Sequence, residues 1–189
     1  MSGTSGSRPV LLLMDFQHGI VESIGAPSVV DAADRAAKAA RAAGIPVMFV
    51  RVGFRPGFPE VAASNASFSA AAQAGDAYTQ DHPGTQVHAA LAPQDGEPVI
   101  VKRRVSAFTG SDLDVLLRGA GADTLVLAGI ATSGVVLSTL RQAADLDYRL
   151  VVLEDACADR DEEVHRVLTG KVFPRQAVVT TTDEWIESL

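Results

Sequence analysis

Cysteine, aromatic residues and basic charge are all scarce in this sequence of 189 residues. The single cysteine, Cys157, excludes a disulfide within the chain and is consistent with a reducing cytoplasm, where we expect the protein to reside. Lysine and arginine number 16 against 23 acidic residues, so the net charge is -7 and no nucleic-acid partner is expected. No apolar run approaches the roughly 20 residues of a membrane-spanning helix, so we expect no such helix and no membrane partner.

Hydrophobic residues make up 47% of the chain, which suffices for one sizeable buried core. We therefore expect a single domain over residues 9–189. Residues 1–8 lack the basic start and apolar stretch of a signal peptide. We expect them to form a flexible tail.

Short apolar runs alternate with amphipathic stretches along the chain. Runs such as Pro9 to Met14 are apolar throughout, as in strands that are buried on both faces of a parallel sheet. The predicted strands are 9–14, 46–52, 99–101, 125–128, 149–153 and 177–180, and the predicted helices are 30–43, 135–144, 161–168 and a short last helix capped by Asp183. The alternation predicts an α/β fold with a mostly parallel sheet between two layers of helices. Residues 53–83 are predicted to form a long irregular segment, a kind that is usually functional or mobile.

Three polar positions follow predicted strands. Asp15 follows the first strand, Lys102 ends the strand 99–101, and Gly129 to Thr132 follow a central strand. Ligands of open α/β sheets bind beyond the carboxyl ends of the strands, so these residues are candidates for a site. Position alone leaves the alternatives open, because Asp15 could equally cap the next turn and Lys102 could be one of three solvated basic residues.

Three motifs at these strand ends resemble those of the isochorismatase-like hydrolases, a superfamily that includes cysteine hydrolases. They are Leu-Leu-Leu-Met-Asp-Phe-Gln ending at Gln17, Val-Ile-Val-Lys ending at Lys102 with Ser-Ala-Phe ending at Phe108, and Leu-Ala-Gly-Ile-Ala-Thr ending at Thr132. Their order and spacing fit from about residue 9 to the end of the sequence. The resemblance implies a three-layer αβα sandwich around a six-stranded sheet in a Rossmann-like order, and a homodimer or higher homo-oligomer.

The resemblance also implies a catalytic triad of aspartate, lysine and cysteine. Asp15 and Lys102 match the first two members. The family pattern Gly-x-x-Thr-x-x-Cys, counted from Gly129, places Val135 at the position of the nucleophile. A valine cannot attack a carbonyl, so covalent acyl transfer by the usual route is not expected. Cys157 lies beyond the next strand and is interpreted as a small buried residue.

Isochorismatases also lack this cysteine, and the resemblance implies that their aspartate protonates the alkene carbon of a vinyl ether. We therefore expect Asp15 to act as a general acid, kept protonated by an apolar pocket, with Lys102 beside it. The glycine that those enzymes carry at the nucleophile position is Val135 here, which narrows the space for a substrate. Two alternatives remain: a catalytically silent ligand-binding or assembly relative, and an amide hydrolase with a non-cysteine mechanism.

The expected substrate is a small, anionic metabolite. Arg55 would bind its carboxylate through a bidentate pair of hydrogen bonds. The expected pocket residues are Gln17, Phe54, Arg55, Phe58, Phe68, Phe108, Ile130, Ala131 and Thr132. The alternative for the phenylalanines is ordinary core or dimer packing. The resemblance implies a cis peptide bond between Ile130 and Ala131, and since the histidines lack a matched carboxylate pattern we expect no metal and no cofactor.

Overall fold

A six-stranded parallel sheet forms the centre of the computed structural model, which describes residues 7–189. The strands are β1 (Pro9–Met14), β2 (Val47–Val52), β3 (Val99–Lys102), β4 (Thr124–Ile130), β5 (Arg149–Ala158) and β6 (Val178–Thr180). Their order in the sheet is β3-β2-β1-β4-β5-β6, and every pair is parallel. The predicted α/β fold is confirmed. Residues 1–6 of the predicted tail lie outside the described residues.

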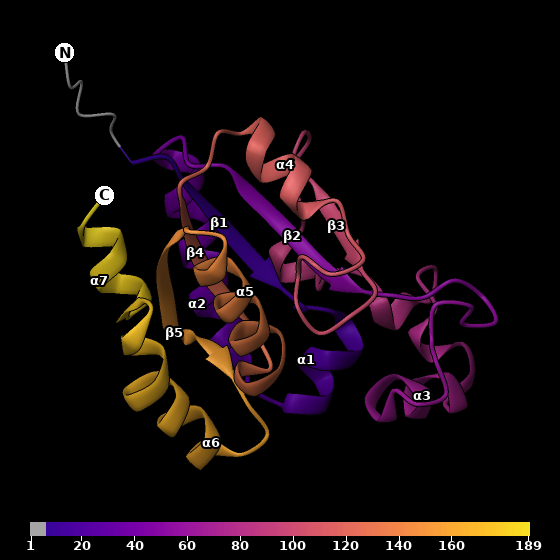
Figure 1. Cartoon of the computed structure of the whole chain (residues 1–189). Coiled ribbons are helices and arrows are strands. Elements are labelled where there is room, and N and C mark those ends of the chain that lie inside the picture. Colours follow the sequence, from indigo (N-terminus) through magenta and orange to yellow (C-terminus); the bar gives the residue numbers. More distant parts are fainter. Residues whose placement is uncertain (1–6) are drawn as a thin grey trace.

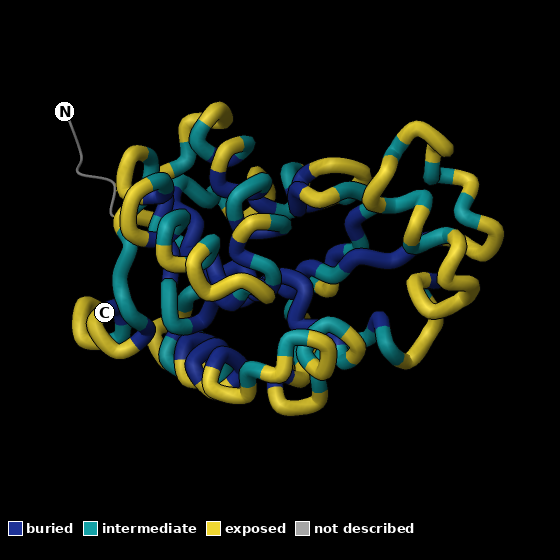
Figure 2. Tube along the Cα trace, turned by 90° about the horizontal axis from the view of Figure 1, so that it is seen from below, coloured by how far each residue is buried: buried dark blue, intermediate teal, exposed yellow. Residues whose placement is uncertain are grey.

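Helices cover both faces of this sheet (Figure 1). Alternate residues of β1 enter two separate cores: Leu12 and Met14 pack against α4 (Leu113–Gly119) and α5 (Leu137–Asp145), while Leu11 and Leu13 pack against α2 (Pro27–Ala42) and α7 (Thr182–Glu187). This alternation follows from the two-residue period of a strand. It explains why the run is apolar throughout. The buried trace therefore fills the middle of the molecule, with exposed turns around it (Figure 2).

The other short elements connect these layers. They are α1 (His18–Ile24), α3 (Ala66–Gln73), α6 (Glu162–Val167) and the single turns 75–78, 83–85, 89–91, 132–136, 168–172 and 173–175. Among residues 7–189, no helix is long and apolar enough to span a membrane.

Three predictions of local structure were wrong. Residues 53–83 are not irregular throughout, because α3 lies within them and begins where the Asn65 side chain accepts the backbone N–H of Phe68. The last helix is capped by Thr181 and not by Asp183, because Thr181 and Glu184 form a reciprocal capping box. β5 also extends to Ala158, beyond the predicted end at residue 153.

The order of the strands determines where a ligand can bind. The chain moves outward from β1 through β2 to β3 on one side, and from β4 through β5 to β6 on the other. The neighbouring strands β1 and β4 thus form the switch point of the sheet, and their carboxyl ends flank a crevice. Asp15 directly follows β1, and Ala131 directly follows β4. The segment that contains α3 stands beyond this end of the sheet (Figure 1).

Candidate active site

Asp15 and Lys102 form a buried ion pair at the ends of β1 and β3. The Lys102 Nζ lies 2.9 Å from the Asp15 Oδ2, and the side chains are 2% and 7% exposed. The same Nζ donates a hydrogen bond to the backbone carbonyl of Arg104 at 3.1 Å. Asp15 has a φ of 59°, in the left-handed region, which turns the chain sharply after the strand. The structure therefore brings together the two residues that the sequence predicted to be catalytic.

The second oxygen of Asp15, Oδ1, is buried and has no hydrogen-bond partner among the described residues. Burial raises the pKa of the Asp15 carboxyl above its ordinary value, although the charge and hydrogen bond of Lys102 and the nearby backbone N–H of Val52 oppose that effect. A buried polar atom without a partner needs an explanation. A proton on Oδ1 supplies one, because the carboxyl could then donate to a ligand while Oδ2 still accepts from Lys102.

Gln17 fixes the floor of the site. Its amide nitrogen donates to the backbone carbonyls of Val52 and Thr85, both at 2.9 Å, and its amide oxygen accepts from the Val52 N–H at 2.8 Å. Gln17 is 1% exposed. These three bonds join the loop after β1 to the end of β2 and to the turn at residues 83–85. Gln17 thus holds the neighbouring parts of the site in register.

The loop after β4 forms the opposite wall. The peptide bond between Ile130 and Ala131 is cis, and a single wide turn over Thr132–Val136 follows it and leads into α5. Val135 lies in this turn and is 2% exposed, with its side chain in the core. Cys157 is buried on the neighbouring strand, and burial raises the pKa of its thiol to about 12.

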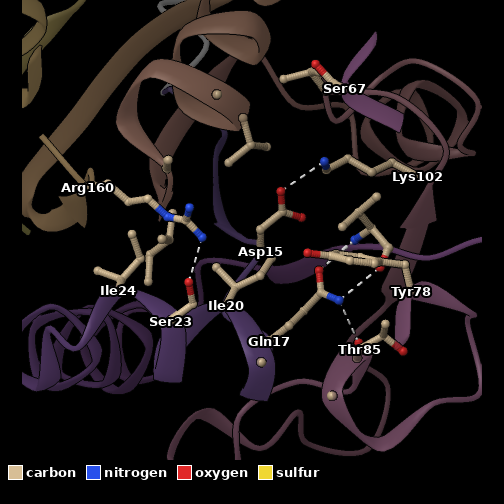
Figure 3. Close-up of a pocket in the computed structure, with 18 of the residues that line it drawn as sticks. Asp15, Gln17, Ile20, Ser23, Ile24, Ser67, Tyr78, Thr85, Lys102 and Arg160 are labelled. Carbon is tan, nitrogen blue, oxygen red and sulfur yellow. Dashed lines mark hydrogen bonds and ion pairs between the residues drawn. The ribbon is translucent and has the colours of Figure 1, made fainter. Parts of the chain in front are cut away.

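A cavity of about 540 Å³ opens beside Asp15 (Figure 3). Most of its wall is apolar, and a few polar groups converge on it. Of the predicted site residues, it is lined by Asp15, Gln17, Phe68, Lys102, Ile130, Ala131 and Val135. The structure therefore brings seven of the predicted residues to one cavity.

The remaining predicted residues do not reach this cavity. Phe54 is fully buried and packs against Phe58 and Phe68, with ring centroids 5.5 and 5.3 Å apart. Phe108 lies in the core against Tyr148, at 6.3 Å. The Thr132 hydroxyl lies 2.8 Å from the His165 Nδ1 and is absent from the lining. These aromatic rings pack against one another. This is the alternative of ordinary core packing that the sequence left open for the phenylalanines.

Arg55 is also placed differently from the prediction. Its Nη1 pairs with the Glu60 Oε1 at 2.5 Å, and the side chain is 61% exposed outside the cavity. The guanidinium that lines the cavity belongs to Arg160, which sequence reasoning missed. Arg160 follows β5 and donates to the Ser23 hydroxyl at 2.7 Å (Figure 3). If β5 had been predicted to extend to Ala158, Arg160 would have been expected near the carboxyl end of a strand.

A metal centre has no donor set in the part of the chain that the structure describes. Groups of three or more histidine, cysteine, aspartate or glutamate side chains with the spacing of metal ligands do not occur there. His82 and His88 each use their Nδ1 to cap a single turn, accepting from Gly84 and Ala90. Their imidazoles therefore serve local structure.

Comparisons with known proteins agree with this arrangement. Residues 9–184 match the model of the isochorismatase domain. The chain is 37% identical to the uncharacterized isochorismatase family protein YecD of Escherichia coli O157:H7, over 95% of both chains. It is 30% identical to the maleamate amidohydrolase of Pseudomonas putida, over 97% of this chain and 88% of that protein. Its fold matches a cysteine hydrolase from Pseudomonas syringae pv. phaseolicola with a TM-score of 0.88, at 25% identity over 95% and 91% of the two chains.

Proposed function

The chain belongs to the isochorismatase family of hydrolases, and we propose that it cleaves a small carboxylate-bearing metabolite with Asp15 as the general acid and without a covalent intermediate. The observation that carries this proposal is the unpartnered, buried Oδ1 of Asp15 at the wall of an apolar cavity. Burial raises the pKa of this carboxyl, which favours the protonated form that a general acid needs. Val135, at the expected position of the nucleophile, offers no group that could form a covalent bond.

The reaction that fits this acid is hydrolysis of a vinyl ether. The proton on Oδ1 moves to the terminal alkene carbon, and the π electrons form the new C–H bond. A water molecule then adds to the resulting oxocarbenium ion and returns one proton to Asp15. The hemiketal breaks its bond to the leaving oxygen and gives a carbonyl compound and an alcohol. One water is consumed, and Asp15 recovers its proton.

Lys102 and Arg160 line the cavity and would favour an anionic substrate. Lys102 lies beside the acid and stabilises negative charge that remains on Asp15 after the proton has left. Arg160 lines the far part of the cavity, and it forms no ion pair with another side chain among residues 7–189. A guanidinium binds a carboxylate bidentately, so Arg160 would bind the substrate carboxylate in place of Arg55.

Amide hydrolysis is the second candidate, and the maleamate amidohydrolase relative favours it. In that reaction Asp15 would be ionised and would act as a general base toward water. The buried Oδ1 of Asp15, which has no partner among the described residues, fits a protonated carboxyl better than a carboxylate. A silent, ligand-binding relative is less favoured, because Val135 borders the cavity without filling it.

The test measures pyruvate release from isochorismate-type vinyl ethers beside ammonia release from amides that include maleamate. We expect pyruvate release that Asp15→Asn lowers by about 10²-fold or more, the usual contribution of a general acid. We also expect activity to fall as the pH rises, with a midpoint above the roughly 3.9 of an ordinary aspartate, because the acid must be protonated. Ammonia release that rises with pH and depends on Asp15 would favour the amidase. Inactivity on both panels would refute the proposed reaction.

Two further properties belong to this proposal. We expect a homodimer or higher homo-oligomer, since closed homo-oligomers are common among soluble enzymes, and light scattering after size-exclusion chromatography measures it directly. We also expect the protein to act in the cytoplasm, where its single buried cysteine stays reduced.

A further inference from the structure

Tyr78 brings a phenol into the cavity from the segment that lies outside the sheet. It ends the turn Gly75–Tyr78 and lines the cavity, and the side chain is directed across it (Figure 3). Its hydroxyl end points to the region that the side chains of Asp15 and Gln17 also face. The hydroxyl makes no hydrogen bond to the other residues labelled in Figure 3. It is therefore available to a ligand.

The proposed reaction needs more than one proton transfer. Asp15 uses its single available oxygen, Oδ1, for the alkene carbon and then for the attacking water, since Oδ2 is held by Lys102. Collapse of the hemiketal still requires a proton on the leaving oxygen, because an unprotonated alkoxide is a poor leaving group. Gln17 cannot supply that proton, because its amide is committed to backbone groups of Val52 and Thr85. A hydroxyl such as that of Tyr78 can do so.

We propose that Tyr78 is a further catalytic residue, which transfers a proton to the leaving oxygen as the hemiketal collapses. The carbon–oxygen bond breaks, the leaving oxygen takes the Tyr78 proton, and the hemiketal hydroxyl returns its proton to the phenolate as the carbonyl forms. The phenol ends as it began, so the step needs no other reactant. This inference rests on the proposed function.

The neighbourhood of Tyr78 is built to hold its position. Its backbone carbonyl accepts the N–H of Phe54 at 2.9 Å, and Phe54 forms a bridge with Thr79. Phe54 is fully buried and packs against Phe58 and Phe68, so an apolar contact supports the backbone that carries Tyr78 when the segment is closed. The phenylalanines that were predicted to line the pocket thus support the backbone of Tyr78, which faces the cavity. A positioned donor contributes to the rate without reorganisation when the reaction occurs.

The chain provides a matched control, since Tyr148 is its only other tyrosine. Tyr148 packs against Phe108, outside the cavity. We expect Tyr78→Phe to lower kcat by about 10²-fold with little change in KM, because a general acid contributes at least that factor. Tyr148→Phe should leave both constants unchanged. Unchanged circular dichroism and Tm would show that Tyr78→Phe still folds.

The second measurement replaces tyrosine by the more acidic 3-fluorotyrosine throughout the chain. In Tyr148→Phe this labels Tyr78 alone, and kcat at a fixed pH should change with little change in KM; in Tyr78→Phe the same replacement should leave kcat unchanged. A Tyr78→Phe enzyme that keeps its kcat and changes only KM would overturn this inference while leaving the Asp15-dependent reaction intact. A wild-type enzyme without vinyl-ether activity would overturn the proposed function, and this inference with it.

Discussion

The two sides of the cavity are held by different kinds of contact. On the sheet side, Asp15 and Lys102 end strands whose residues are packed into two apolar cores. On the other side, the segment 53–85 is tied to the sheet by arginines that donate to its polar groups. Arg51 donates to the Gln80 carbonyl at 2.8 Å, and Arg104 donates to the Glu60 carbonyl at 2.8 Å.

This difference separates two tasks. Close packing fixes the reacting pair to within fractions of an ångström, as catalysis requires. Hydrogen bonds at a partly exposed edge break and re-form at lower cost, so a segment held by them can open locally while the sheet remains folded. We therefore expect the sheet side to determine the chemistry and the outer segment to admit the substrate.

The largest expected effect compares two buried phenylalanines. Phe49 on β2 belongs to the core between the sheet and α2, whereas Phe54 belongs to the small aromatic group under the outer segment. Phe49→Ala should lower the free energy of unfolding by about 3–5 kcal/mol, the usual cost of such a cavity. Phe54→Ala should lower it by less, and it should speed amide hydrogen exchange selectively in residues 53–85.

Urea unfolding and hydrogen exchange measure both quantities. Equal losses of unfolding free energy, with uniform exchange in both variants, would show that the outer segment and the sheet unfold as one unit. The comparison between the two sides would then fail.

The next effect concerns thiol chemistry on the sheet side. Val135→Cys replaces two methyl groups by one sulfur, a net loss of one heavy atom from a well-packed site, so we expect little loss of stability. The introduced thiol would border the cavity, and a cysteine that is accessible to solvent has a pKa of about 8.5. Burial raises the pKa of Cys157 to about 12. Iodoacetamide at pH 8 should therefore label the introduced thiol roughly 10³-fold faster than Cys157.

Mass spectrometry of the peptides assigns the label. Labelling of wild-type protein at a comparable rate would mean that Cys157 is more accessible than its burial indicates. Absence of labelling in Val135→Cys would contradict the position of that turn at the cavity.

The prediction of intermediate size concerns substrate binding and compares two arginines, one on each side of the cavity. Arg160→Gln removes a guanidinium that lines the cavity, and we expect KM for a carboxylate substrate to rise by roughly 10–100-fold, the worth of a charged hydrogen bond. Arg55→Gln serves as the matched control, because Arg55 is exposed outside the cavity and pairs with Glu60. A larger effect at Arg55 would restore the original prediction and contradict the assignment to Arg160.

The sequence predicted the sheet well for a physical reason. Strands buried on both faces are apolar throughout, and that pattern needs no knowledge of the neighbours. Asp15, Gln17 and Lys102 could be identified because they stand directly beside such strands and within motifs. The sheet order then brings the strand ends together.

The outer part of the site could not be predicted in the same way. Phe54, Phe58 and Phe68 lie in one segment and are alike in chemistry, but only Phe68 lines the cavity. Which ring faces a ligand depends on how the segment folds over the sheet. Arg160 was missed because β5 continues past the carboxylates Glu154 and Asp155, which ended the apolar run that marked the strand.

The smallest expected effect tests the ties of the outer segment. Glu60 accepts from Arg55, lies 3.4 Å from the Arg103 Nε, and has one buried oxygen without a partner among the described residues. Burial acts to raise the pKa of Glu60, but hydrogen bonds from backbone groups and from Arg55 outweigh it, so the pKa is lowered. Glu60→Gln should weaken the closed segment by about 1 kcal/mol, the order of a partly exposed ion pair.

The lowered pKa fixes the pH dependence. The folded state holds the ionised carboxylate more favourably than the unfolded state does, so this stabilisation is present at neutral pH and is lost as the pH falls below the ordinary glutamate value of about 4.3. After correction for intrinsic exchange rates, the amides of residues 53–85 should therefore lose protection on acidification in the wild type. The loss of protection should be smaller in Glu60→Gln. Glu163→Gln, which alters an exposed pair on α6, should behave like the wild type. An identical acid response in Glu60→Gln would show that other groups hold the segment in place.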